Sequence, residues 1–256
     1  MRQPFKPLFP SSTPRFRPTQ DVGCGFLAFN FRGVGSSEGA VTTAADLVAD
    51  VAACVEALLQ RGVQPRHLLL HGFSLGGAVA ALFLASQTQR GICYVSDRSF
   101  RSLSRTAYGI VRGARLPGSD HPSDEGAAAA AAAVPRAAQL VRAVGAWSRA
   151  VAGCIAVGAL RACSWDLCAE EVWPRITSRK VLLYHCKDNV IHFATASMYQ
   201  ALLRSGCAAN CNLQIIQVRR TDHKGWPAHD FPLCVEPPVW SELVRCVRAA
   251  LQMPVE

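Results

Sequence analysis

One heptapeptide, H-G-F-S-L-G-G, constrains the fold more than any other part of the chain, because it places the pattern G-x-S-x-G around Ser74. The apolar run before it, residues 68–70, predicts a short buried strand, and the apolar run after it, residues 78–85, predicts a buried helix. A serine on such a sharp strand-to-helix turn adopts a strained backbone conformation. Gly72 and Gly76 avoid the collisions that a Cβ would make with the neighbouring strand or helix.

The same turn predicts a nucleophilic serine. It holds the Ser74 hydroxyl above the sheet, and the first N–H groups of the following helix, beginning at Leu75, face a developing oxyanion. The alternative is a glycine-rich turn in which Ser74 only caps the helix. A serine hydroxyl is a poor nucleophile and needs a histidine to take its proton, oriented by a carboxylate. In this architecture the acid follows the serine along the chain, and the histidine follows the acid.

The sequence offers two candidates for each of these partners. Asp188, in V-L-L-Y-H-C-K-D-N-V-I, follows a predicted strand beyond the serine and is the favoured acid, whereas Asp97 follows the preceding strand and is the alternative. Two histidines follow the last predicted strand, His223 in T-D-H-K-G-W and His229 in P-A-H-D-F-P-L. We favour His229 because a His-Asp pair followed by apolar residues is typical of a histidine in this role, and His223 stays open as the alternative.

Strand and helix patterns alternate along the rest of the chain. A capping box at Thr43 and Asp46 predicts the start of a helix, and Trp240 begins the pattern of a closing amphipathic helix. Short apolar runs predict strands at residues 26–31, 67–74, 92–96, 181–185 and 213–218. Further helices are expected at residues 75–89 and 192–205. This alternation predicts an α/β fold, with a mainly parallel sheet flanked by helices on both faces.

Two segments depart from this alternation. Residues 1–20 hold five prolines, four basic residues and no acid, and predict a disordered tail. Residues 101–170 contain a glycine-, proline- and serine-rich stretch and a run of seven alanines, residues 127–133. We interpret residues 101–170 as an inserted helical cap within a single domain that spans residues 21–256.

Cysteine content and hydropathy indicate the cellular compartment of the protein and bear on metal sites and membrane spans. The eleven cysteines are odd in number and the chain shows no secretory signal, which favours a reducing, cytoplasmic compartment. The cysteine spacings lack the C-x-x-C pattern of zinc sites, so we expect no metal and no cofactor. No apolar run reaches eighteen residues, which argues against a membrane-spanning helix.

The net charge of +9 bears on the partners of the protein. Its arginines are spread along the chain, and the small clusters at residues 15–17 and 219–220 are not interleaved with aromatic residues. This pattern predicts a solvated basic face and no nucleic-acid partner. It also allows peripheral attraction to an anionic membrane or to an acidic substrate. No feature indicates an obligate protein partner.

With these residues in place, the chain resembles the α/β-hydrolase superfamily over residues 24–256. F-N-F-R-G-V-G-S-S-E-G is similar to the loop after the strand that precedes the nucleophile strand in that fold. V-S-D-R-S-F-R-S-L, S-W-D-L, E-V-W-P-R-I and K-D-N-V-I resemble one branch, the effector-like hydrolases of chlamydial and legionella type. The resemblance implies hydrolysis of an ester, thioester or amide through Ser74, Asp188 and a histidine.

One departure from the family leaves the function open. Family members have an earlier strand with a His-Gly-type loop that completes the oxyanion hole, but only a proline-rich stretch precedes Phe26 here. We therefore expect an N-terminally truncated chain that lacks the first strands of the fold. The leading hypothesis is a serine hydrolase that cleaves an acyl ester or thioester. The alternatives are a catalytically impaired, hydrolase-like interaction module and an acyltransferase that uses the same residues.

Overall fold

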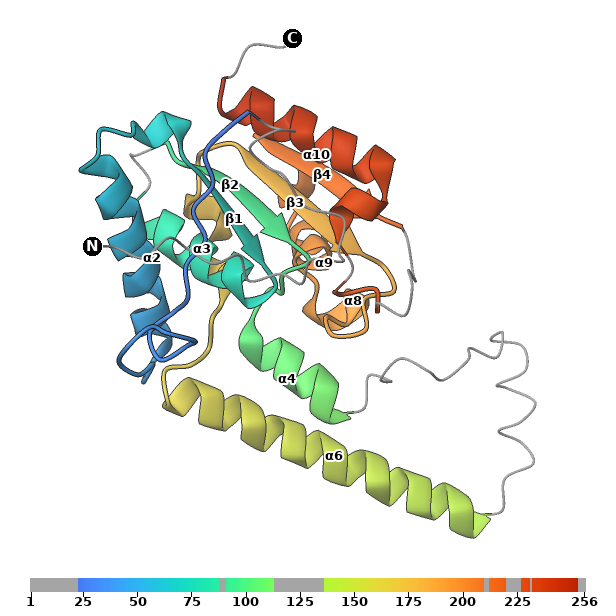
Figure 1. The fold of residues 1–256 in the computed structure, drawn as a ribbon. Helices are drawn as coiled ribbons and strands as arrows, with labels where there is room; N and C mark the ends of the chain where they lie inside the picture. The colour runs from blue at the N-terminus through green and yellow to red at the C-terminus, as the bar shows by residue number, and fades with distance from the viewer. Residues whose placement is uncertain are drawn as a thin grey trace.

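A computed structural model describes residues 23–87, 91–112, 136–209, 212–219, 227–230 and 232–252. Within these ranges, parallel strands form one sheet in the order β1-β2-β3-β4 (Figure 1). The strands are β1 (Leu69–Phe73), β2 (Cys93–Asp97), β3 (Lys180–His185) and β4 (Leu213–Val218). Each of them lies within two residues of a predicted strand. All the arrowheads lie at one end of the sheet, so the carboxyl ends of the strands meet along one edge.

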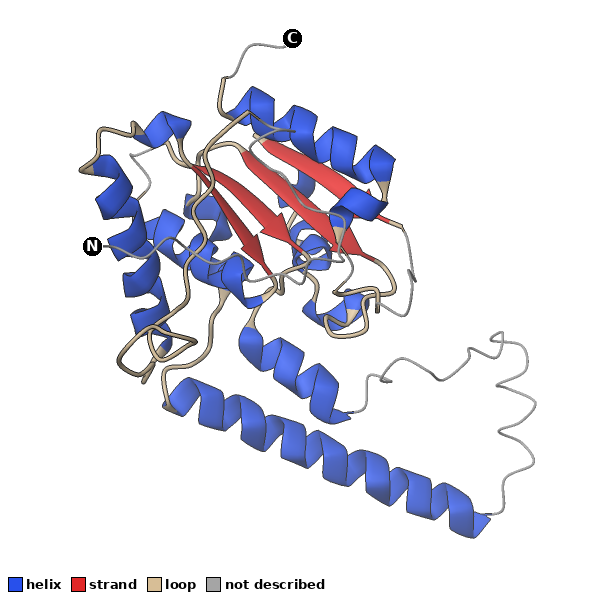
Figure 2. Ribbon diagram, in the orientation of Figure 1, coloured by secondary structure: helices blue, strands red, loops and turns tan. Residues whose placement is uncertain are grey.

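Helices cover both faces of this sheet (Figure 2). The longer α-helices are α2 (Ala44–Leu59), α3 (Leu75–Ser86), α4 (Leu103–Arg112), α6 (Arg136–Ala162) and α10 (Pro237–Ala250). The short α-helices are α7 (Ala169–Val172), α8 (Phe193–Ala196) and α9 (Met198–Arg204). Single 3₁₀ turns lie at Pro65–His67, Trp173–Arg175, Cys207–Ala209 and Leu233–Val235.

The strand pattern divides the core into two layers. Successive side chains of a strand point to opposite faces of the sheet, so Tyr94 of β2 packs on one side and Val95 on the other. The Tyr94 side also holds Leu182 of β3 and the buried faces of α2, α3 and α9. The Val95 side is covered by α10, through Leu243 and Val247. The two layers bury β2 and β3 on both faces, which explains the continuous apolar runs at residues 93–95 and 181–184.

The start of α2 matches its sequence pattern. Thr43 is the N-cap, and its backbone N–H donates to the Asp46 carboxylate at 2.9 Å, as the predicted capping box requires. Arg32 also reaches the Asp46 carboxylate at 3.1 Å and that of Asp50 at 2.6 Å. These ion pairs tie the polar loop after residue 31 to the first turns of the helix.

The predicted strand at residues 26–31 is wrong. The segment is irregular in the structure, and Phe26 and Leu27 are 60% and 46% exposed. Within the described part of the chain, β1 pairs with β2 alone, which makes β1 an edge strand. An apolar run becomes a strand only when a neighbouring strand accepts its backbone hydrogen bonds, and residues 26–31 have no such ladder here.

The single helix predicted for residues 192–205 is divided in two. Ser197 separates α8 from α9 with an extended backbone (φ −64°, ψ 136°). It forms an isolated antiparallel bridge with Phe100, and Arg101 N–H donates to the Ala196 carbonyl at 2.8 Å. This long-range pairing with the segment after β2 overrides the local helical pattern.

The helices α4 and α6 lie in sequence between β2 and β3, within the segment predicted to be a cap. They pack against each other at the end of the sheet where the strands finish (Figure 1). The seven-alanine run at residues 127–133 and the tail at residues 1–20 lie outside the described residues. Among the helices that the structure describes, none is both long and apolar enough to cross a membrane.

Candidate active site

Ser74 occupies the single residue between the end of β1 and the start of α3. Its backbone is left-handed, with φ 50° and ψ −115°, which is an unfavourable conformation for a residue with a side chain. The Ser74 N–H donates to the Asp97 carbonyl at the end of β2, at 2.9 Å. The Ser74 carbonyl accepts from Gly77 N–H at 3.1 Å, within the first turn of the helix. Both bonds hold the strained residue in place.

Two glycines make this turn possible. A Cβ on Gly72 would overlap the carbonyl of Gly76, as predicted, but a Cβ on Gly76 would meet open space, so the collision predicted at Gly76 is wrong. A Cβ on Gly77 would lie 2.6 Å from the Cβ of Ser99, closer than real Cβ atoms approach a neighbour. The strand, the helix and the segment after β2 therefore meet at a distance that only glycine permits.

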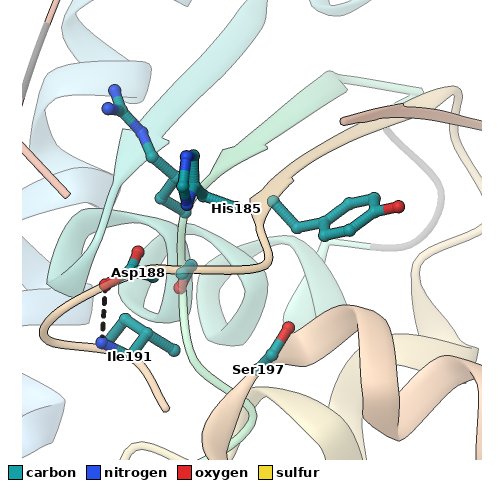
Figure 3. Close-up of a pocket in the computed structure, with 7 residues that line it drawn as sticks. His185, Asp188, Ile191 and Ser197 are labelled. Carbon is teal, nitrogen blue, oxygen red and sulfur yellow. Dashed lines mark hydrogen bonds between the residues drawn. The ribbon is translucent and has the colours of Figure 1, made fainter. Parts of the chain in front are cut away.

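Asp188 and His229 meet at the same edge of the sheet, after β3 and β4. His229 Nδ1 lies 2.8 Å from Asp188 Oδ2, and both side chains are buried. The other oxygen, Oδ1, accepts from the backbone N–H groups of Val190 at 2.8 Å and Ile191 at 2.7 Å (Figure 3). Because a carboxylate only accepts hydrogen bonds, His229 Nδ1 is the donor, and Nε2 is left as the acceptor nitrogen.

His229 is held on two further sides. Its backbone N–H donates to the Asn189 side-chain oxygen at 2.9 Å. Its ring lies 4.9 Å from the ring of Phe73, the residue that immediately precedes Ser74. The loop after β3 and the turn after β1 therefore fix the position of the imidazole together.

Asp97, the alternative acid, has different partners. Its carboxylate is buried and pairs with Arg98 Nε at 2.8 Å and His71 Nε2 at 3.3 Å. Burial alone would raise the pKa of Asp97, but the Arg98 charge and the hydrogen bonds from His71 and Arg98 outweigh it and hold that pKa well below its usual range. The structure thus pairs His229 with Asp188, and Asp97 with a neighbouring cation.

Arg98 links this ion pair to the histidine. Its backbone has a positive φ of 45°, and its N–H donates to the Leu183 carbonyl of β3 at 2.9 Å. Its guanidinium carbon lies 4.9 Å from the centre of the Phe73 ring, within the range of a cation–π interaction. Phe73 therefore contacts the imidazole of His229 and the guanidinium of Arg98.

The comparison with protein families agrees with this geometry. The model of a family described as "Alpha/beta hydrolase family" matches residues 6–233. The chain belongs to the alpha/beta hydrolase family. The predicted α/β-hydrolase fold is therefore confirmed. No curated protein sequence matches this hydrolase.

Solved structures share the fold of this hydrolase at low sequence identity. An esterase from Pyrococcus furiosus superposes with a TM-score of 0.52 and 17% identity, over 87% of this chain and 68% of the esterase chain. A monoacylglycerol lipase from Paleococcus ferrophilus gives a TM-score of 0.50 and 17% identity, over 91% of this chain and 87% of the lipase chain.

A small pocket lies beside Asp188. Figure 3 shows Asp188, His185 and Ser197 among its lining residues, which also include Arg98 and the buried Ser99. Its volume is about 10 Å³, which matches a single water molecule rather than an acyl substrate. This pocket is therefore too small to bind an acyl group.

The remaining predicted residues fall in two groups. Leu75 is the first residue of α3, at the helix end whose N–H groups lack partners within the helix. His223 lies outside the described residues. No cluster of metal-ligating side chains occurs within the described ranges, and the ten cysteines they contain are free thiols.

Three supporting residues are not among those predicted from the sequence: Asn189, Phe73 and Arg98. Asn189 and Phe73 are direct neighbours of predicted site residues, so their position in the chain was the available signal. Arg98 is an arginine at the end of an apolar strand, next to an acid, which is a sequence signal for a buried ion pair.

Proposed function

We propose that this hydrolase cleaves acyl esters or thioesters through an acyl-enzyme on Ser74. His229 is the general base, Asp188 orients it, and the Leu75 N–H is one donor to the oxyanion. The observation that carries the proposal is the 2.8 Å bond from His229 to Asp188, beside a serine on a left-handed strand-to-helix turn.

In the first half-reaction, the Ser74 hydroxyl gives its proton to Nε2 of His229 as Oγ forms a bond to the substrate carbonyl carbon. The carbonyl π electrons move to the oxygen, and the Leu75 N–H at the start of α3 donates to this oxyanion. The intermediate collapses when the bond to the leaving group breaks. The leaving alcohol or thiol takes the proton from His229, and the acyl group stays on Ser74.

Water completes the cycle in the second half-reaction. His229 removes a proton from a water molecule, whose oxygen attacks the acyl carbon. Collapse of the second intermediate breaks the bond to Oγ, and His229 returns its proton to Ser74. The Asp188 carboxylate favours each step because it stabilises the imidazolium that forms twice in the cycle.

The surroundings of His229 support its role as a base. The bond to Asp188 directs Nδ1 inward, so Nε2 is the nitrogen that can accept a proton. The contact with Phe73 places the imidazole beside the turn that carries Ser74.

Two structural neighbours, an esterase and a monoacylglycerol lipase, make esters the first substrates to test. Short p-nitrophenyl esters report turnover directly by the release of p-nitrophenol. We expect Ser74→Ala to lower kcat by at least about 10⁴-fold, because the nucleophile is removed. Ser86→Ala is the control, since it removes a hydroxyl from the other end of the same helix. Equal turnover by wild type and Ser74→Ala would refute the proposal.

A further inference from the structure

The helix α6 carries an exposed apolar stripe. Trp147 and Ile155 are 69% and 66% exposed, and Val151 between them is 38% exposed. The three residues are spaced four apart, so they lie on one face of the helix. Large apolar side chains gathered on one exposed face mark a surface that binds a protein, a membrane or a ligand.

This stripe faces away from the helix that packs on α6. Gly153 lies against Tyr108 of α4, and a Cβ at this position would lie 2.7 Å from Tyr108 Cδ2. Gly153 is two residues from both Val151 and Ile155, which corresponds to about 200° around a helix. The contact with α4 and the apolar stripe therefore occupy opposite sides of α6.

The charge of the two helices has a single sign. Together α4 and α6 contain six arginines and no aspartate or glutamate. Arg105 and Arg149 are exposed, and Arg161, which is also exposed, pairs with Asp166 beyond the end of α6. An apolar face that carries a tryptophan, on a helix whose charges are all basic, is the pattern of a segment that lies in the interface of an anionic membrane.

We propose that the α4–α6 hairpin docks the protein on an anionic lipid surface. Trp147, Val151 and Ile155 enter the boundary between headgroups and acyl chains, and the basic charge of the two helices attracts the hairpin to the anionic headgroups. The docking stands independently of the chemistry. The corollary that the ester substrate is supplied by the membrane rests on the proposed function.

A second copy of the chain is a poorer occupant of this stripe. A symmetric dimer through this face would bring two hairpins together, each with six arginines and no acid. Facing like charges oppose such an association. A lipid surface supplies the opposite charge over the whole length of the helix, so it fits the apolar and the basic features together.

The position of the hairpin fits delivery of a lipid ester. The strands finish at the end of the sheet that faces α4 and α6 (Figure 1). Ser74, Asp188 and His229 follow strands at that same end. Docking through α6 would therefore turn the candidate active site toward the membrane.

Sedimentation with vesicles tests the proposal. The vesicles contain phosphatidylcholine alone or phosphatidylcholine and phosphatidylserine in equal amounts. We expect the wild type to bind the phosphatidylserine vesicles more tightly and to be released as salt concentration rises. We expect the double variant Trp147→Gln/Ile155→Gln to lower the partition coefficient by about tenfold or more, because the apolar stripe is lost. Glutamine is a good helix former, so α6 is retained, which circular dichroism checks.

Two further variants make the test specific. Leu203→Gln makes the same change at an exposed position on α9, away from the hairpin, and we expect its binding to equal that of the wild type. Ser74→Ala should also bind as the wild type does, which separates docking from catalysis. Wild-type protein that ignores phosphatidylserine vesicles, or a double variant that still binds them, would overturn the proposal. A wild-type dimer that this double variant converts to a monomer would overturn it too, as would binding to an acidic polypeptide in place of vesicles.

Discussion

The candidate active site and the α4–α6 hairpin lie at the same end of the sheet but are built in opposite ways. At the site, the charged groups are buried and bonded: Asp188 accepts three hydrogen bonds, and Asp97 pairs with Arg98 and His71. On α6, large apolar side chains are exposed instead. The contrast indicates that the candidate active site holds a few charged groups in fixed positions, whereas α6 presents an exposed apolar face to a binding partner.

Backbone strain is found at the candidate active site. Ser74 and Arg98 both have left-handed backbones at the ends of neighbouring strands, and each is held by a hydrogen bond to the adjacent strand. Such strain persists only where the surrounding structure fixes it. Substitutions at the site should therefore have large effects, and those on the exposed face of α6 should have small ones.

Among substitutions that leave the Ser74 nucleophile in place, the largest effect is expected for Asp188→Asn, on activity. An asparagine in place of the carboxylate can hold His229 in the wrong tautomer, and in a related arrangement such a change lowers kcat by about 10⁴-fold. Asp230→Asn is the matched control, since Asp230 is exposed and adjacent to His229 in the chain. Steady-state hydrolysis of p-nitrophenyl esters measures both variants. Comparable losses of kcat in the two variants would contradict a specific role for the buried Asp188 carboxylate.

The next effect is expected for Asp97→Asn, on stability. The substitution removes the carboxylate that faces the buried Arg98 guanidinium, and loss of one partner of a buried pair costs about 3–5 kcal/mol. Urea unfolding at neutral pH measures it. A cost below about 1 kcal/mol, typical of a surface pair, would show that this ion pair is not a fixed part of the site.

The same variant should alter the acid dependence of stability. The pKa of Asp97 is lowered in the folded state, so its pairing stabilises the protein above the unfolded value of about 3.9. That contribution is lost as the pH falls below this value toward the lower, folded pKa. Wild-type stability should therefore fall more steeply than that of Asp97→Asn in this acid range. Parallel curves would contradict the assignment.

A smaller change in stability is expected for Gly72→Ala. The added Cβ would overlap the Gly76 carbonyl, and overpacking of this kind costs about 1–3 kcal/mol. Gly76→Ala makes the same change two positions beyond Ser74, where the Cβ meets open space. Thermal unfolding should place Gly72→Ala well below the wild type and Gly76→Ala at or slightly above it. The reverse order would disprove the close packing of this turn.

The smallest change is expected for Ile155→Gln. This side chain is exposed on α6, so its substitution should alter the unfolding free energy by no more than about 0.5 kcal/mol. Urea unfolding beside the wild type measures it. A loss of unfolding free energy above about 1 kcal/mol would mean that Ile155 is packed against the protein in solution. The apolar stripe would then not be an exposed surface.

The features that were predictable from the sequence are those set by local pattern. The strand, Ser74 and helix form a continuous stretch, and the capping box at Thr43 needs only three residues. Asp188 was found because it follows a strand closely, and the structure brings it to His229. Their catalytic roles, and the narrower bacterial branch of the family, stay predictions.

What the sequence did not reveal depends on pairing between distant segments. Residues 26–31 are apolar enough for a strand, but no strand among the described residues pairs with them. The break at Ser197 comes from its bridge to Phe100, far away in the chain. Asp97 and Asp188 both follow strands, so the sequence alone does not distinguish them; in the structure Asp188 pairs with His229, and Asp97 pairs with Arg98.

Labelling with a fluorophosphonate probe tests the central claim most directly, because the probe reacts with a serine only where the site activates it. The folded wild-type protein should be labelled, mass spectrometry should find the adduct on Ser74, and the Ser74→Ala variant should stay unlabelled. Folded wild-type protein that remains unlabelled, or a Ser74→Ala variant that is labelled equally, would contradict the claim that Ser74 is the nucleophile.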